Sequence, residues 1–371
     1  DDIRNDYQKM PQITASYRGG QEWLGVEPIF TTQLSHFESD SVRVTGQRLY
    51  TEAGLTMPQR WVSGFFTPTV KYRSVSYELD DFPLLDETSP DAGAMMASLD
   101  GGLIFERQTT LGGTSMTQTL EPRAYYLYSE YEQQTGHPDF DSAELTFSYN
   151  QLYRDTRFSG HDRIDDANQL SLGVTTRFIN NKTGNETLSA SVGQIYYLRD
   201  REVRLNPFDP DLGEHTSAIA AELIWSPSAK WQLRSSLLYD TNQNTFDAAY
   251  AQASFRPAAH TIFNVGYTLR EPPPSLVDRP VTEQATASLY YPINDTWSVF
   301  GAYEYSLEAS EVVESMAGFE YDDCCWRVRL LYMRYVDTLV GDVVDFNDPN
   351  LERESSFQIQ VVLKGMGGFG G

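Results

Sequence analysis

The sequence predicts an all-β protein, a transmembrane antiparallel β-barrel of the outer-membrane type, on three observations. Apolar and polar residues alternate with the period of two expected of β-strands, in roughly 18 runs. Many runs reach about ten residues, whereas strands of soluble proteins average about five or six. Short and long connections alternate between the runs, as they do on the two rims of outer-membrane barrels.

Four runs show the alternation most clearly, at 170–178, 231–239, 326–333 and 357–364. In the last run, one face carries Phe357, Ile359, Val361 and Leu363, and the other carries Gln358, Gln360, Val362 and Lys364. No segment shows helical periodicity over a comparable length. A soluble β-sandwich would show the same alternation, so the lengths of the runs and of their connections must favour one fold over the other.

The connections alternate in length through five successive hairpins. Short turns are predicted at Asn180–Asn185, Ser226–Ala229, Pro257–Ala259, Pro292–Asp295 and Asp322–Asp323. The connections between them are mostly longer and are predicted at 199–214, 241–244, 271–280, 307–310 and 337–353. Before residue 167 the alternation is less regular, because 129–142 is long where a short turn is expected. Because unpaired backbone groups are costly in hydrocarbon, these strands must close into a barrel, alone or with further strands from a missing N-terminal part.

Composition agrees with this fold class. No stretch approaches 18 consecutive apolar residues, which excludes a membrane-spanning helix, and the 13% aromatic content suits strands that end at lipid–water interfaces. The net charge of −24 argues against nucleic acid as a partner. Acids in the connections are predicted to be solvated loop charge, with divalent-cation binding as the alternative: Asp209, Asp211, Glu214, Asp342, Asp345 and Asp348.

No catalytic constellation is evident, so we expect neither an enzyme nor a cofactor or metal site. The five histidines form no HExxH pattern, and no GxSxG motif is present. A glycosidase-type acid pair stays open among the 52 acids, because nothing singles one out. Gly365, Gly367 and Gly370 form a loose GxGxxG, but no helix follows to hold a pyrophosphate, so a flexible exit from the last strand is predicted.

Cys324 and Cys325 are the most informative chemical feature of the sequence. A bond between neighbouring residues strains disulfide geometry, so the pair is not expected to close on itself. Free thiols do not persist in an oxidising compartment, so the partners are expected outside this sequence or in another chain. Two structural or free cysteines are the alternative. The alternation of connections places the pair on the periplasmic rim.

The segment Leu120–Tyr128, with the sequence LEPRAYYLY, places a proline inside a strand pattern. Pro122 cannot donate to a β-ladder, so it should lie at a bulge or a weakly paired position. Glu121 and Arg123 share one face of this strand and are candidates for an ion pair inside the barrel. A solvated pair that contributes little is an equal alternative.

These segments resemble the LptD family of outer-membrane lipopolysaccharide-assembly proteins. The resemblance covers most of the chain after about residue 100, and four segments carry it in this order: LEPRAYYLY at 120–128, the run from Asp162 to Phe178, SVGQIYY at 191–197, and the turn Asp-Asp-Cys-Cys-Trp at 322–326. It implies that residues 1–371 are the C-terminal part of one transmembrane barrel in the Gram-negative outer membrane. A periplasmic jellyroll and the first barrel strands, one side of the seam among them, would lie outside this sequence.

The resemblance also implies roles and partners. Lipopolysaccharide would reach the outer leaflet through a lateral seam between the first and last strands. One lip of that seam would be the strand 354–364, which contains Phe357, Gln358, Ile359, Gln360, Val361, Val362 and Leu363, and Gly365, Gly367 and Gly368 would help it fray. Cys324 and Cys325 would bond to cysteines near the jellyroll. The implied partners are lipopolysaccharide, the plug lipoprotein LptE, the periplasmic transport bridge and the barrel-assembly machinery.

Three rival functions remain. A porin or nutrient channel explains the alternation and the acidity, but it gives no reason for adjacent cysteines. An outer-membrane enzyme such as a lipase would need the catalytic constellation that the sequence lacks. A lectin-like soluble β-sandwich predicts extraction without detergent.

Overall fold

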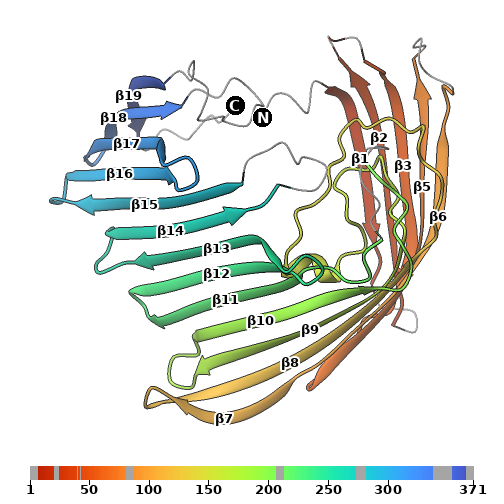
Figure 1. Ribbon diagram of the computed structural model, residues 1–371, viewed down its shortest axis with the longest axis horizontal. Coiled ribbons are helices and arrows are strands. Elements are labelled where there is room, and N and C mark those ends of the chain that lie inside the picture. Colours follow the sequence, from red (N-terminus) through yellow and green to blue (C-terminus); the bar gives the residue numbers. More distant parts are fainter. Residues whose placement is uncertain are drawn as a thin grey trace. The chain divides into compact units, whose positions relative to one another are not determined.

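The computed structural model describes residues 7–20, 25–39, 41, 43–80, 87–205, 213–272, 281–336 and 353–364. Over these ranges the protein contains 19 β-strands, paired antiparallel with their neighbours, and a single 3-10 helix. Figure 1 shows the strands lying side by side within each part of the chain. The prediction of an all-β fold is therefore confirmed. Within the described ranges, no helix has the length and apolarity needed to cross a membrane.

The chain divides into two compact units. The first unit comprises residues 1–177, 191–221 and 240–245, and the second comprises 178–190, 222–239 and 246–371. The elements centred in the first unit are β1 (Gln8–Arg18), β2 (Glu27–Glu38), β3 (Gly46–Thr56), β4 (Gln59–Trp61), β5 (Gly64–Leu79), β6 (Asp91–Leu103), β7 (Phe105–Leu111), β8 (Thr114–Ser129), the 3-10 helix (Tyr149–Tyr153), β9 (Ala167–Asn180) and β10 (Glu186–Tyr197). Those centred in the second are β11 (Ile219–Ser228), β12 (Trp231–Asp240), β13 (Thr245–Phe255), β14 (Ile262–Arg270), β15 (Thr282–Pro292), β16 (Trp297–Ser306), β17 (Glu311–Asp322), β18 (Trp326–Val336) and β19 (Arg353–Leu363).

Consecutive strands pair with one another in both units. In the first unit the antiparallel order runs through β1, β2, β3, β5, β6 and β8, with the short strands β4 and β7 paired to β5 and β8. In the second unit β13 to β19 pair in chain order. This meander of hairpins follows from short connections, which leave sequential antiparallel strands as neighbours.

A break in the ladder marks Pro122. The pairing of β6 with β8 ends at Gly102 and Arg123, and β7 resumes it at Phe105 and Leu120. Pro122 lies in the gap between these two pairings, on the side of β8 that faces β6 and β7, where a residue without a backbone N–H is tolerated. The prediction that this proline occupies a weakly paired position is confirmed.

The connection between β8 and β9 corrects the expectation for 129–142. Residues 130–166, here called the folded segment, contain no strand, but only the 3-10 helix and an isolated bridge between Glu144 and Phe158. The whole segment is one connection, so the alternation of short and long connections also holds here. The predicted connections 271–280 and 337–353 lie largely outside the described residues, as do residues 206–212 of the connection 199–214.

One face of the strands is apolar and exposed in each unit. In the first unit Leu55 is paired with Val70, and both side chains are exposed. In the second, Phe357 and Ile359 are 77% and 72% exposed, and Ile359 lies opposite the exposed Leu330. Such contiguous apolar surface is rare on soluble monomers and suits a wall that faces lipid.

The opposite face of the first unit is buried under the folded segment. Apolar residues of β2, β5 and β6 form a cluster with two residues of the folded segment: Phe37, Val75, Tyr77, Leu79, Ala92, Ala94, Phe140 and Ile164. The rings of Phe37 and Phe140 stack with their centroids 4.3 Å apart. This packing gives the folded segment a defined position inside the first unit.

Candidate functional site

The candidate site is the inward face of the first unit together with the folded segment that covers it. Figure 1 shows the folded segment as yellow-green coil beside β2, β3 and β5, and side-chain contacts join it to these strands. Few of its residues belong to regular elements, so its backbone relies on side chains for hydrogen-bond partners.

The centre of the site is an ion pair removed from water. The Arg48 guanidinium of β3 lies 2.6 Å from Asp162 and 2.5 Å from Asp141, and the side chains of Arg48 and Asp162 are both 0% exposed. The second oxygen of Asp162 accepts hydrogen bonds from the backbone N–H groups of Phe140 and Asp141. Tyr77 of β5 donates to Asp162 over 3.1 Å. Asp162 therefore joins two strands to the folded segment through one carboxylate.

Asp141 carries a second cation besides Arg48. Lys9 of β1 lies 2.9 Å from its carboxylate. Burial alone would raise the pKa of Asp141, but Arg48 and Lys9 outweigh burial and hold the pKa below its ordinary value. The Asp141 carboxylate is therefore charged at neutral pH.

A second ion cluster lies on β3, β5 and the end of the 3-10 helix. Arg73 contacts Glu52 and Asp155, each at 2.7 Å, and Lys71 contacts Asp155 at 2.9 Å. Burial would raise the pKa of Asp155, but Arg73 and Lys71 outweigh burial and lower it. Two cations and two anions thus neutralise one another beneath the folded segment.

The folded segment is also joined to the connection after β10. Arg163 donates to the carbonyl groups of Pro138 and Arg204. The Asp166 carboxylate accepts from the backbone N–H groups of Glu202 and Val203. Because charged side chains here satisfy backbone groups, two irregular connections share one hydrogen-bond network.

Two glycines explain how the 3-10 helix approaches the sheet. A Cβ atom on Gly193 would lie 2.6 Å from Leu152 and 2.7 Å from the Leu172 carbonyl. A Cβ atom on Gly173 would lie 2.1 Å from the Tyr153 hydroxyl. Both glycines belong to segments that carry the family resemblance, and the close approach of the helix gives a physical reason for them.

Glu121 and Arg123 have separate partners in the structure. Arg123 donates to both oxygens of Asp100 at 2.7 and 2.8 Å, whereas Glu121 lies 3.3 Å from Arg177. Residues two apart on a strand are farther from each other than from cross-strand neighbours, and the long arginine side chains therefore reach across. The expected pair between Glu121 and Arg123 is thus corrected to two cross-strand pairs.

Cys324 and Cys325 lie in the turn between β17 and β18, and both are exposed free thiols. Their sulfur atoms are 2.9 Å apart, without a disulfide bond. Asp323 accepts a hydrogen bond from the Cys324 backbone N–H at 2.7 Å. The sequence placed the cysteines beside a turn, and the structure places them within it. Their pairing with distant cysteines stays a prediction.

The predicted seam strand is β19. It pairs with β18 over its whole length, from Val336–Arg353 to Trp326–Leu363. Its outward residues are exposed and apolar: Phe357, Ile359, Val361 and Leu363. Gln358, Gln360 and Val362 alternate with them, and Gly365, Gly367, Gly368 and Gly370 lie outside the described residues. The seam itself stays a prediction.

A smaller ion cluster lies on the inward face of the second unit. Glu320 of β17 accepts from Arg329 at 2.5 Å and from the Tyr290 hydroxyl at 2.8 Å, and Arg327 lies 3.6 Å away. The side chains of Arg327 and Arg329 are 35% and 39% exposed. The two guanidinium groups therefore remain in contact with water, whereas the Glu320 side chain between them is 2% exposed.

Sequence reasoning missed the buried charges of the folded segment. Asp162, Asp165 and Asp166 are all buried, and the sequence pattern singled out none of them as an ion-pair or binding residue. The available signal was the resemblance of the segment Asp162–Phe178 to a known family, because three acids in five residues before a strand otherwise indicate a loop. Among the described residues, no group of three acids, histidines or cysteines has the geometry of a metal site.

Strands with a lipid-compatible outer face and a charged, covered inner face define the wall of a membrane β-barrel. The family model described as LptD, LPS transport system D, matches residues 2–297. The chain therefore belongs to the LptD family. The predicted class, an antiparallel barrel of the Gram-negative outer membrane, is confirmed by the sheet and by this family.

Curated relatives agree with this assignment. The LPS-assembly protein LptD of Nitrosococcus oceani is 36% identical over 98% of this chain and 47% of its own length. Its counterpart in Pseudomonas aeruginosa is 34% identical over 98% of this chain and 46% of its own length. The chain thus spans about half the length of these relatives. Among solved structures, a ferric enterobactin receptor from Pseudomonas aeruginosa covers 95% of this chain and 60% of its own, at a TM-score of 0.39 and 9% identity, too low to carry an argument.

Proposed function

We propose that this chain is the C-terminal part of a barrel that inserts lipopolysaccharide into the outer leaflet of the outer membrane. The observation that carries the proposal is the family match over residues 2–297, and the exposed apolar face of the strands supports it. The remaining half of the protein would supply the periplasmic jellyroll and the first barrel strands. The protein would act by guiding lipid and not by catalysis.

Lipopolysaccharide would leave through a lateral seam whose one lip is β19. The opposite lip would be the first strand of the complete barrel. A strand at such a closure needs a partner for its backbone groups in lipid, so the seam must be able to open and re-form. The exposed side chains of Phe357 and Ile359 would then face the lipid that passes.

A cross-link tests this proposal in the full-length protein. One cysteine is introduced at Gln358 of β19 and one on the facing strand, and the pair is bridged by an oxidant in living cells. We expect newly made lipopolysaccharide to stop reaching the cell surface, and to resume after reduction. The Gln358 cysteine variant without its partner is the control. Unchanged surface delivery in fully cross-linked protein would contradict the proposal.

Cys324 and Cys325 would form disulfides with cysteines near the jellyroll. The exposure of both thiols in one turn supports this, because each sulfur is accessible to another segment. Full-length protein should migrate differently with and without reductant, and the double variant Cys324→Ser, Cys325→Ser should lose that difference. Equal mobility of the wild type under both conditions would overturn the proposal.

The expected partners are the plug lipoprotein LptE, the periplasmic transport bridge and, during folding, the barrel-assembly machinery. Purification of the full-length protein tests this set against a diffusion channel. Recovery of a lipoprotein together with lipopolysaccharide supports the assembly role. Recovery of the barrel alone, with solute flux through it in vesicles, would favour the channel.

A further inference from the structure

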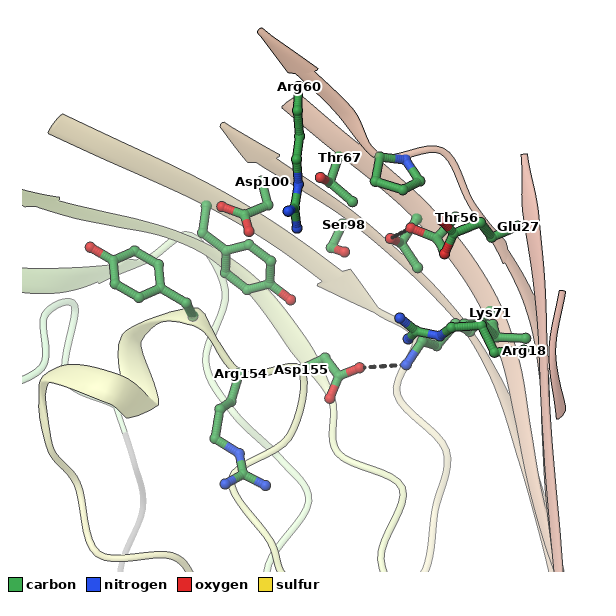
Figure 2. Close-up of a pocket in the computed structure, with 15 residues that line it drawn as sticks. Arg18, Glu27, Thr56, Arg60, Thr67, Lys71, Ser98, Asp100, Arg154 and Asp155 are labelled. Atoms are coloured by element: carbon green, nitrogen blue, oxygen red, sulfur yellow. Dashed lines mark hydrogen bonds and ion pairs between the residues drawn. The ribbon is translucent and has the colours of Figure 1, made fainter. Parts of the chain in front are cut away.

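A cavity of about 720 Å³ lies in the first unit, beneath the folded segment. Its walls come from β1 to β6, from β8, and from the last residue of the 3-10 helix with the two residues after it. Figure 2 shows these side chains around the cavity, with Arg60 reaching in from β4 and Lys71 joined to Asp155. The volume lies within the range of roughly 300–1,000 Å³ that is usual for small-molecule sites.

Two carboxylates in the cavity wall are already matched by cations. Both oxygens of Asp100 accept from Arg123, at 2.7 and 2.8 Å. Asp155 lies 2.9 Å from Lys71 and 2.7 Å from Arg73. Each of these carboxylates is paired with a cation of the wall, so its repulsion of an anionic ligand is partly cancelled.

Three arginines in the same wall form no ion pair with a carboxylate of the described residues. Arg18, Arg60 and Arg154 line the cavity, and within the described part of the chain no ion pair joins any of them to a carboxylate. Glu27 is the remaining acid of the wall. The cavity therefore holds an excess of positive charge, although the whole chain carries a net charge of −24.

Hydroxyl groups complete the lining. Thr56 and Thr69 share a hydrogen bond of 2.8 Å, and Thr67, Ser98 and Tyr125 also face the cavity. Hydroxyls both donate and accept, which suits a ligand that itself carries many hydroxyls. Guanidinium groups match phosphate oxygens in pairs, which suits a ligand that also carries phosphate.

The cavity lies toward one rim of the sheet. Arg18 ends β1, Thr56 ends β3 and Glu27 begins β2, so these three residues mark the same rim. The folded segment joins β8 and β9 at the opposite rim. Because long connections of outer-membrane barrels are extracellular, the cavity lies on the periplasmic side of the folded segment.

We propose that this cavity binds the phosphate-bearing saccharide headgroup of a glycolipid that arrives from the periplasm, with Arg18, Arg60 and Arg154 as its phosphate ligands. The proposal rests on the assembly function and adds a binding site to it. The headgroup would be held in the first unit while its acyl chains remain free to enter the membrane.

Calorimetry on the full-length protein with its co-purified partner tests the site. The probes are a glucosamine disaccharide that carries two phosphates and no acyl chains, the same disaccharide without phosphate, and inorganic phosphate. The triple variant Arg18→Gln, Arg60→Gln, Arg154→Gln is compared with Arg234→Gln, which removes a charge from β12 outside the cavity. Because no carboxylate of the described residues is paired with any of the three arginines, the triple variant should melt like the wild type.

We expect the bisphosphorylated disaccharide to bind the wild type and Arg234→Gln alike, and roughly tenfold or more weakly to the triple variant, since charge-assisted hydrogen bonds are lost. Binding should weaken with added salt. Equal binding of the phosphate-free disaccharide, or no effect of the triple variant, overturns the proposal. Equally tight binding of inorganic phosphate overturns its saccharide part and leaves a site for free anions.

Surface delivery of lipopolysaccharide, measured in cells that carry the same proteins, distinguishes this inference from the proposed assembly function on which it rests. If the wild-type protein delivers lipopolysaccharide to the surface but binds no probe, only the cavity proposal fails. If the probe binds but surface delivery does not depend on the protein, the assembly function fails and the anion site stands.

Discussion

The inward faces of the two units carry charge in different ways. In the first unit, Arg48 and Asp162 form an ion pair that water does not reach, and the folded segment is built around it. In the second unit, the buried carboxylate of Glu320 is surrounded by Arg327 and Arg329, whose side chains stay more than one third exposed. The first arrangement holds a segment in place, and the second lines a wet surface.

This difference shows when an ion pair is needed for the stability of the fold. Removing one partner of a buried ion pair leaves the other charge without water or counter-ion, which is costly. Removing the Glu320 carboxylate leaves two partly exposed guanidinium groups that water can solvate, which costs little. The same residue types should therefore respond to mutation very differently in the two units.

The largest effect is expected from Asp162→Ala. It leaves Arg48 with Asp141 alone and removes the acceptor for two backbone N–H groups, so the first unit should lose about 3–5 kcal/mol of stability. Hydrogen exchange of residues 137–166 in the full-length protein measures the loss. Glu214→Ala, at an exposed acid, is the control. Unchanged protection in Asp162→Ala would break the contrast between the units.

The second-largest effect is expected from acid, which should destabilise the folded segment. The folded-state pKa values of Asp141 and Asp155 lie below the ordinary value of 3.8, so their stabilisation is complete at neutral pH and is lost as the pH falls below about 4. Proteolysis of the folded segment after incubation at pH 7 and pH 3 reports the change. In Asp141→Asn the pH dependence should shrink, and an undiminished dependence would argue against this origin.

An intermediate effect is expected from Gly193→Ala. The new methyl group would push against Leu152 and the backbone of β9, which costs about 1–3 kcal/mol and displaces the 3-10 helix. Gly136→Ala, where a Cβ atom has open space, is the matched control in the folded segment itself. Denaturant unfolding of both variants checks the difference, and equal midpoints would show that the close approach is dispensable.

The smallest effect is expected from Glu320→Gln in the second unit. The amide can still accept from Tyr290, and the two freed arginines can hydrate, so the cost should be about 1 kcal/mol or less. The denaturant midpoints of Glu320→Gln and Asp162→Ala, measured under the same conditions, test the comparison between the two units. A loss as large as that of Asp162→Ala would show that exposure does not decide the strength of these clusters.

Strand positions were accessible from sequence because alternation is a local signal. The runs 170–178, 231–239 and 326–333 lie within β9, β12 and β18, and 357–364 ends one residue beyond β19. Pro122 was also predictable, because the missing N–H acts at its own position in the ladder.

The folded segment was not accessible in the same way. Its contacts join residues such as Arg48 and Asp162, which are 114 positions apart, and no periodic pattern encodes them. The prediction that Glu121 pairs with Arg123 was wrong for a related reason. The partner of each side chain depends on the register of the neighbouring strands. Register is set by cross-strand packing and turn geometry, which a single strand does not display.

The contacts of Asp162 also imply an order of assembly. Its carboxylate meets Arg48 and Tyr77, which are contributed by strands that precede it by 114 and 85 residues. Those contacts exist only once β3 and β5 stand side by side in register. We therefore expect the folded segment to dock only after β3 and β5 have paired, so that the space it occupies is open to solvent until then.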